Sequence, residues 1–557
     1  MEEFVRLPTT VDFQAVVSER LLQYIAERPY IRLGARLGND YVIAYTNELY
    51  MREIYRDLGA DYLSLSPKIL SPVDAAGNEA AGITRVLGQP FLDLSGNGVL
   101  IGIIDTGIDY TNPVFQYEDN TTKLVGLWDQ TIDGEREEGI YFGSTYTQEQ
   151  INEALASPAP LSVIQSIDED GHGTFMASAA AANTEDAYIG AAPGAAIAAV
   201  KLRRARPYYI NRFLLSPENT NLYESTDFLL GIQYVLGLSM RMNMPAVILI
   251  GMGSNTSAHD GNSLFEDYIS SLAERAGCAV VCAAGNEANA RHHTAGSIRT
   301  GSSDRINIKV GRQGVSFGTL LFTPAFDKIS VSVTSPTGEQ MSRKPFRAGE
   351  EYEERLILEN TTITLRFSRE RNNTIWVGLK DATEGIWEIT LYGEAIVSGE
   401  YQAWLPITGQ VDDSVEFLRP VSEYTIVFPA TAQRDIVCGA YNSLDGSLLI
   451  SSSWGPSRSG KPAPDLVAPG VQVAGVYPEG YGTMTGTSVS AAITAGAAAL
   501  LMEWGILQEN MPDINGERIR NLLIGGAVRE KTLTYPNNKW GYGKLNLYGT
   551  FEYLINR

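Results

Sequence analysis

Residues 99–107 read VLIGIIDTG, an apolar run that ends in a polar turn of Asp, Thr and Gly. Apolar runs of the same kind recur at residues 195–202, 246–250 and 279–282. Strands that are apolar at every position are covered on both faces, which is typical of a parallel sheet between helices. The sequence therefore predicts an α/β fold, and such sheets bind their ligands at the carboxyl ends of the strands.

Three polar motifs lie where strands or loops end. Asp105 follows the first apolar run, His172 stands between two glycines in DGHGT (residues 170–174), and Ser488 opens an Ala-rich helix in GTSVS (residues 486–490). Serine is a poor nucleophile at its own pKa, so an imidazole must take its proton and a carboxylate must orient that imidazole. The three residue types together indicate acyl transfer.

A fourth motif, AAGNE at residues 283–287, follows the apolar run 279–282. A side-chain amide at such a strand end can donate a hydrogen bond to the oxyanion of a tetrahedral intermediate. Asn286 is therefore the candidate oxyanion donor.

These blocks resemble the active-site motifs of the subtilases, the subtilisin-like serine proteases of the S8 family. The order Asp, His, Ser along the chain is the subtilisin order. The resemblance covers residues 76–292 and 429–557, and further matching blocks lie at residues 190–193, 453–456 and 468–470. It implies a subtilisin-like parallel sheet flanked by helices.

The resemblance also implies a role for each site residue. Asp105 orients the base, His172 is the general base and acid, and Ser488 is the nucleophile. Asn286 stabilises the oxyanion together with the backbone N–H of Ser488. No cofactor is required for this chemistry.

More narrowly, the chain looks like the clostridial Csp proteases, which activate the precursor of a spore cortex-lytic hydrolase during germination. That likeness implies a protein substrate, an autoprocessed prodomain that acts as a partner of the enzyme, and other Csp-like proteins as partners. Two alternatives stay open: a catalytically silent Csp-like pseudoprotease that senses a germination signal or binds a partner, and a general intracellular subtilase.

The domain organisation follows from changes of pattern along the chain. Residues 1–75 are expected to form an α+β prodomain, with helices near 16–26 and 49–58 and strands near 41–46 and 62–65, and to be cut off within residues 66–77. Apolar and polar residues alternate at every second position in residues 329–333, 363–367 and 387–392. This pattern predicts antiparallel strands with one solvent-exposed face. We therefore expect an inserted β-sandwich or jelly roll at residues 293–428, between the catalytic segments 76–292 and 429–557.

One departure from the subtilase pattern lies beside the expected active site. The specificity strand, usually polar before its Ser-Leu-Gly, reads LIGMG at residues 249–253. The wall of the substrate pocket is therefore changed, and the substrate preference of the family cannot be transferred to this chain.

Composition excludes several other classes of protein. The 557 residues carry 43 basic and 65 acidic side chains, a net charge of −22, so nucleic acid is not an expected partner. Residues 1–6 contain two acids and lead into no apolar run, which predicts cytoplasmic synthesis without a signal peptide, and the Csp likeness adds deposition in the spore. Residues 480–502 are rich in Gly, Thr, Ser and Ala, which predicts a buried helix rather than a membrane span.

The remaining cysteines, histidines and acidic residues are given structural roles. Three cysteines, Cys278, Cys282 and Cys438, are expected to be small buried residues, because three cannot build a disulfide framework. His259, His292 and His293 are expected in loop or surface positions. Residues 183–186 lie about where subtilisins hold a structural calcium ion, but they offer too few oxygen ligands, so a solvated loop is predicted.

Overall fold

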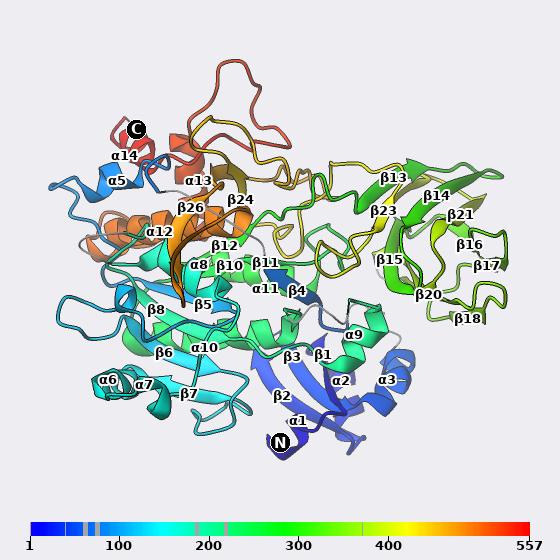
Figure 1. Cartoon of the computed structure of the whole chain (residues 1–557), viewed down its shortest axis with the longest axis horizontal. Coiled ribbons are helices and arrows are strands. Elements are labelled where there is room, and N and C mark those ends of the chain that lie inside the picture. The colour runs from blue at the N-terminus through cyan, green and yellow to red at the C-terminus, as the bar shows by residue number, and fades with distance from the viewer. Residues whose placement is uncertain are drawn as a thin grey trace.

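The computed structural model describes residues 2–38, 40–58, 65–72, 78–183, 189–216, 221–369 and 371–556. Its centre is an eight-stranded sheet with the order β25-β24-β12-β10-β5-β8-β6-β7 (Figure 1). All neighbouring strands are parallel except β6 and β7. The strands are β5 (Leu100–Asp105), β6 (Leu124–Asp129), β7 (Ser144–Thr147), β8 (Ala196–Lys201), β10 (Ala246–Ile250), β12 (Cys278–Ala283), β24 (Ile436–Tyr441) and β25 (Leu466–Pro469).

Helices cover both faces of this sheet, as the apolar runs predict. Successive side chains of a strand point to opposite faces. Ile101 and Ile103 of β5 therefore pack into one apolar core, with helices α8 (His172–Ala181) and α12 (Thr487–Met502). Leu100 and Ile104 pack into a second core on the other face, with α10 (Ser225–Met242) and α11 (Leu264–Ala273).

Helix α12 continues into a π-helical turn, η3 (Glu503–Leu507). Within the part of the chain that the structure describes, the segment Thr487–Leu507 has the length and hydropathy of a membrane-spanning helix, but 89% of its apolar window is buried inside the protein. The predicted buried helix is confirmed for residues 487–502, whereas residues 480–484 of the same stretch form the strand β27 (Gly480–Met484) instead.

The N-terminal unit, in its described residues, is a three-stranded antiparallel sheet with three α-helices and one 3-10 helix. Its strands have the order β1-β3-β2. The predicted helix near 16–26 begins only at Glu19, because β1 extends to Val16 and the Ser18 side chain caps the helix by accepting a hydrogen bond from the N–H of Leu21. Of the predicted strand 62–65, residues 62–64 lie outside the described residues. The elements are α1 (Glu2–Val5), β1 (Thr10–Val16), α2 (Glu19–Ala26), β2 (Ile31–Leu37), β3 (Tyr41–Asn47), η1 (Glu48–Tyr50) and α3 (Met51–Leu58).

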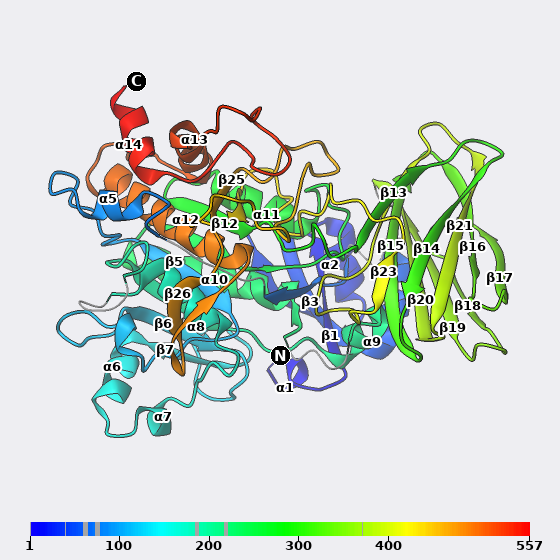
Figure 2. The same cartoon turned by 45° about the horizontal axis from the view of Figure 1, so that its top comes forward.

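A second unit, the β unit (β13 to β23), consists of two antiparallel sheets that share one apolar core. The sheets have the orders β13-β22-β15-β20-β19-β18 and β17-β16-β21-β14-β23. Figures 1 and 2 show them at one end of the molecule, beside the central sheet. The strands are β13 (His293–Ser297), β14 (Ser303–Val310), β15 (Val315–Pro324), β16 (Lys328–Thr334), β17 (Gln340–Pro345), β18 (Glu351–Arg355), β19 (Thr362–Arg369), β20 (Asn372–Ala382), β21 (Gly385–Ala395), β22 (Glu400–Trp404) and β23 (Val415–Phe417).

Short elements complete the molecule. Strand β4 (Ile69–Pro72) lies between β9 (Tyr223–Glu224) and β11 (Met252–Gly253) in a separate three-stranded sheet. The remaining elements are α5 (Ile83–Leu87), η2 (Pro113–Phe115), α6 (Gln148–Ala156), α7 (Pro160–Val163), α9 (Pro207–Phe213), the hairpin of β26 (Val473–Tyr477) and β27 (Gly480–Met484), α13 (Gly516–Gly526) and α14 (Leu547–Ile555).

Candidate active site

Asp105 and His172 meet at the carboxyl end of β5. Asp105 is the last residue of β5, and His172 is the first residue of α8 after Gly171, whose φ of 85° favours glycine. The Nδ1–H of His172 donates to Asp105 Oδ1 over 2.6 Å, and the backbone N–H of Thr106 donates to the same oxygen over 2.7 Å. Both side chains are buried, so the carboxylate fixes the orientation of the imidazole.

Ser488 lies beside this pair. It is the second residue of α12, and its Oγ donates to the carbonyl of Gly251 over 3.0 Å. A Cβ placed on Gly251 would be 3.4 Å from His172 Cε1 and 3.5 Å from Ser488 Cβ. The imidazole and the hydroxyl-bearing carbon therefore converge on one point above Gly251. Because Ser488 lies in the first turn of α12, the unpaired N–H groups of that turn favour negative charge next to it.

Asn286 approaches the same serine from the end of β12. Its Oδ1 accepts a hydrogen bond from the N–H of Thr487 over 3.1 Å, and Thr487 Oγ1 accepts one from the N–H of Gly285 over 3.0 Å. Holding the amide oxygen against Thr487 directs the amide nitrogen to the opposite side. The structure thus brings together all four residues that the sequence selected.

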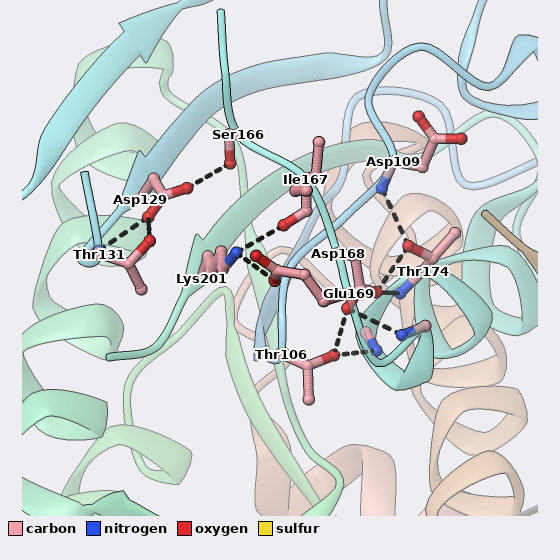
Figure 3. Close-up of polar contacts among 12 residues, drawn as sticks. Thr106, Asp109, Asp129, Thr131, Ser166, Ile167, Asp168, Glu169, Thr174 and Lys201 are labelled. Carbon is pink, nitrogen blue, oxygen red and sulfur yellow. Dashed lines mark hydrogen bonds and ion pairs between the residues drawn. The ribbon is translucent and has the colours of Figure 1, made fainter. Parts of the chain in front are cut away.

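A buried carboxylate that sequence reasoning missed connects these loops (Figure 3). Asp168 Oδ1 accepts hydrogen bonds from Thr106 Oγ1 over 2.8 Å and from the N–H of Gly171 over 2.9 Å. Its Oδ2 accepts bonds from Thr174 N–H and Oγ1 over 2.9 and 2.7 Å. Thr106 Oγ1 in turn accepts from the N–H of Gly173 over 2.9 Å. Asp168 therefore fixes the turn after Asp105 to the first turn of α8, which carries His172.

The segment that holds Asp168 is itself anchored on both sides (Figure 3). Ser166 Oγ donates to Asp129 Oδ2 over 2.6 Å. Lys201 Nζ donates to the carbonyl of Ile167 over 2.7 Å and forms an ion pair of 2.5 Å with Glu169. A carboxylate four residues before the histidine, with threonines in both neighbouring motifs, was the sequence signal for this network.

The loop-or-surface prediction for the other three histidines holds in part: His259 and His292 lie in loops, but His293 begins β13 and all three side chains are buried. His259 and His293 each stack against Trp404, with ring centroids 4.3 and 4.6 Å from that of the indole. Burial lowers the pKa of His259 to about 4 and that of His293 to about 3. His292 lies 2.7 Å from Glu287 through Nδ1. The sequence could not reveal these contacts, because Trp404 is more than a hundred residues away along the chain.

The cysteines are buried as predicted. Burial raises the pKa of Cys278 and of Cys438 to about 12, so their thiols remain protonated and unreactive. In the described residues, no group of three or more His, Cys, Asp and Glu side chains could hold a metal ion. Residues 184–188, which include most of the loop considered for calcium, lie outside that description.

Strand β4 lies next to the segment that contacts Ser488. Pro72 is paired with Met252 and Ser71 with Gly253 on one side, and Leu70 is paired with Tyr223 on the other. Before it, the N–H of Lys68 donates to Ser225 Oγ over 2.8 Å. Residues 69–72, between the N-terminal unit and the central sheet, are thus held as an extended strand that ends beside the candidate site.

Comparisons with known proteins agree with this geometry. The model of the subtilase family, Peptidase S8, matches residues 96–306 and 414–543, on both sides of most of the β unit. The solved structure of the CspB protease of Clostridium perfringens superimposes with a TM-score of 0.76 and 31% identity, covering 86% of this chain and 97% of that one.

Curated relatives match over shorter stretches. The serine protease AprX of Bacillus subtilis (strain 168) is 32% identical over 146 residues, 22% of this chain and 29% of that protein. Subtilisin E of the same organism is 32% identical over 124 residues, 22% of this chain and 28% of that protein. The match spans less than a third of these relatives, whereas the family model and the CspB structure cover most of the chain. The chain belongs to the subtilase family.

Proposed function

We propose that the protein is a serine endopeptidase in which Ser488 is the nucleophile and His172 is the general base and acid. The observation that carries this proposal is the 2.6 Å hydrogen bond from His172 to Asp105, with Ser488 and His172 side by side above Gly251. Because Nδ1 donates to the carboxylate, Nε2 is the ring nitrogen left to accept a proton. This is the tautomer that an acyl-transfer base requires.

The reaction follows from these contacts. When a peptide carbonyl enters the cleft, Ser488 Oγ leaves the carbonyl of Gly251, attacks the carbon and passes its proton to His172 Nε2. Asp105 stabilises the imidazolium that forms. The amide of Asn286 and the N–H of Ser488 donate to the oxyanion. His172 then returns the proton to the leaving amine, and water hydrolyses the acyl-enzyme by the same steps.

A fluorophosphonate probe tests this assignment. We expect it to label the wild-type protein and to leave Ser488→Ala unlabelled. Ser490→Ala is the matched control, since Ser490 lies on the same helix and donates to the carbonyls of Ala468 and Pro469 instead. A folded wild-type protein without label would contradict the proposal and favour a binding role.

We also propose that residues 1–75 act as a prodomain that Ser488 itself cuts off. The course of β4 supports this. The strand ends at Pro72, which is paired with Met252. Gly251, the residue just before Met252, accepts the hydrogen bond from Ser488 Oγ. The cut is therefore expected directly after β4. On a denaturing gel, the wild type should give two bands and Ser488→Ala one, and the large fragment should begin within residues 73–78. If the wild type and Ser488→Ala both run only at full length, self-processing is refuted.

For the physiological role, we propose that the protein acts in the spore and activates the precursor of a cortex-lytic hydrolase, alongside other Csp-like proteins. The support is the likeness to CspB over almost the whole of that structure. Incubating the processed protein with such a precursor should give one defined cut, and Ser488→Ala should give none. Indiscriminate degradation of the precursor and of casein would instead favour general proteolysis.

A further inference from the structure

Val427 fills the gap between the two loops that flank Ser488. One loop contains Gly251 and Gly253, and the other contains Gly285 and leads to Asn286. A Cβ added to Gly253 would overlap Val427 Cγ2, and one added to Gly285 would lie 2.5 Å from Val427 Cγ1. The two methyl groups of Val427 therefore rest against the bare backbone of both loops.

This gap is where a substrate side chain next to the cut bond would go. Gly251 accepts the hydrogen bond of Ser488, and Asn286 is bonded to the preceding Thr487, so the two loops bracket the nucleophile. Strand β4 shows the course of an extended peptide, because it pairs with Met252 and Gly253. Alternate side chains of a peptide on that course point toward the gap.

Val427 cannot easily move out of the way. Its N–H donates to the carbonyl of Ala284 over 3.0 Å, and the next residue, Phe428, exchanges two hydrogen bonds of 2.9 Å with Ser254. The side chain is only 1% exposed, and a β-branched residue has few alternative rotamers. The floor of the pocket is therefore fixed by the backbone on both sides.

We propose that Val427 makes the pocket for the residue before the cleaved bond shallow, so that the enzyme cuts after small side chains such as Ala and rejects aromatic ones. This inference rests on the proposed endopeptidase function. The chain's own sequence agrees with it: the segment expected to be cut, residues 73–77, reads VDAAG, which contains no bulky side chain.

Peptide p-nitroanilides that differ only in the last residue, Ala or Phe, test the proposal on the processed full-length protein. A hydrophobic pocket discriminates about 10- to 200-fold per methylene, so kcat/KM of the wild type should be at least about tenfold higher for Ala than for Phe. Val427→Ala should raise the ratio of kcat/KM for the Phe peptide to kcat/KM for the Ala peptide at least about tenfold. Val333→Ala, in the core of the distant β unit, is the matched control and should leave the ratio unchanged.

Two results would overturn the inference. One is a wild type that cleaves the Phe peptide as well as the Ala peptide, which needs no variant to fold. The other is a Val427→Ala protein that still takes the fluorophosphonate label but keeps the wild-type ratio. Absence of label and of hydrolysis in the wild type would instead refute the endopeptidase function, and this inference with it.

Discussion

At the scale of single residues, the candidate site depends on groups that do no chemistry. Asp168 accepts four hydrogen bonds, which together connect the turn after Asp105 to the start of the helix that carries His172. Hydrogen bonds to a charged group contribute about 1.5–3 kcal/mol each, more than neutral ones. Asp168 is thus a positioning residue: it sets the distance between acid and base without touching substrate.

Asp168→Asn tests this role. The new amide NH₂ would face at least one of the present donors, so we expect kcat for a peptide substrate to fall about tenfold or more with KM little changed, and the free energy of unfolding to drop by about 1.5–3 kcal/mol. Asp109→Asn is the control, because the Asp109 carboxylate bonds only to Thr111 in its own turn among the contacts that the described residues show. Equal kcat values for the two variants would contradict a positioning role.

At the scale of elements, a buried lysine holds the C-terminal end of α8. Lys123 directly precedes β6, and its Nζ donates to the carbonyl of Ala181 and, over 2.5 Å, to that of Pro193. The side chain is fully buried, and desolvation lowers its pKa to about 7. This contact joins both sides of the loop considered for calcium, so a cationic side chain of the protein itself ties these two backbone segments together.

Lys123→Met should take the lysine donor away from two buried carbonyls and lower the free energy of unfolding by about 1–3 kcal/mol. The pH dependence gives a second check. The folded pKa lies below the ordinary value of 10.5, so between about pH 7 and pH 10 the unfolded chain binds more protons, and the stability of the wild type should rise relative to the variant. Urea unfolding at several pH values measures both, with the exposed Lys309→Met as control. A difference that shrinks with rising pH would be inconsistent with a depressed pKa.

Sequence patterns predicted the elements whose signal is local. Residues 100–104 alternate between the two cores, and His172 lies at the start of a helix. Both features follow from short stretches of the sequence. The burial of His259 and His293 against Trp404, and the pairing of β4 with β9 and β11, depend on long-range packing. No short window of sequence contains that information.

At the scale of the whole molecule, one apolar cluster joins three parts of the chain. Phe13 of the N-terminal unit, Tyr209 of α9 and Phe322, Trp376 and Trp404 of the β unit belong to it. Such shared burial should oppose local opening, since opening any one part exposes the others. We therefore expect the β unit to stabilise the protein rather than capture substrate.

Deleting residues 300–428 from the Ser488→Ala protein should expose this cluster. The half-life of the intact protein during digestion by an added protease should then be several-fold shorter. Trp404→Ala removes one shared side chain and should shorten it less, because burial of a large aromatic residue contributes about 3–5 kcal/mol. Digestion of both variants beside the Ser488→Ala parent measures the effect. A deletion variant as resistant as the parent would leave the β unit without a stabilising role.

The position of β4 between β9 and β11 has a kinetic consequence for the proposed enzyme. A strand attached to its own binding cleft competes at a fixed local concentration, whatever amount of outside peptide is present. Once severed, it becomes an ordinary dissociating ligand. Activity should then appear after a delay whose length is set by departure of the severed strand, and adding more substrate should not shorten that delay.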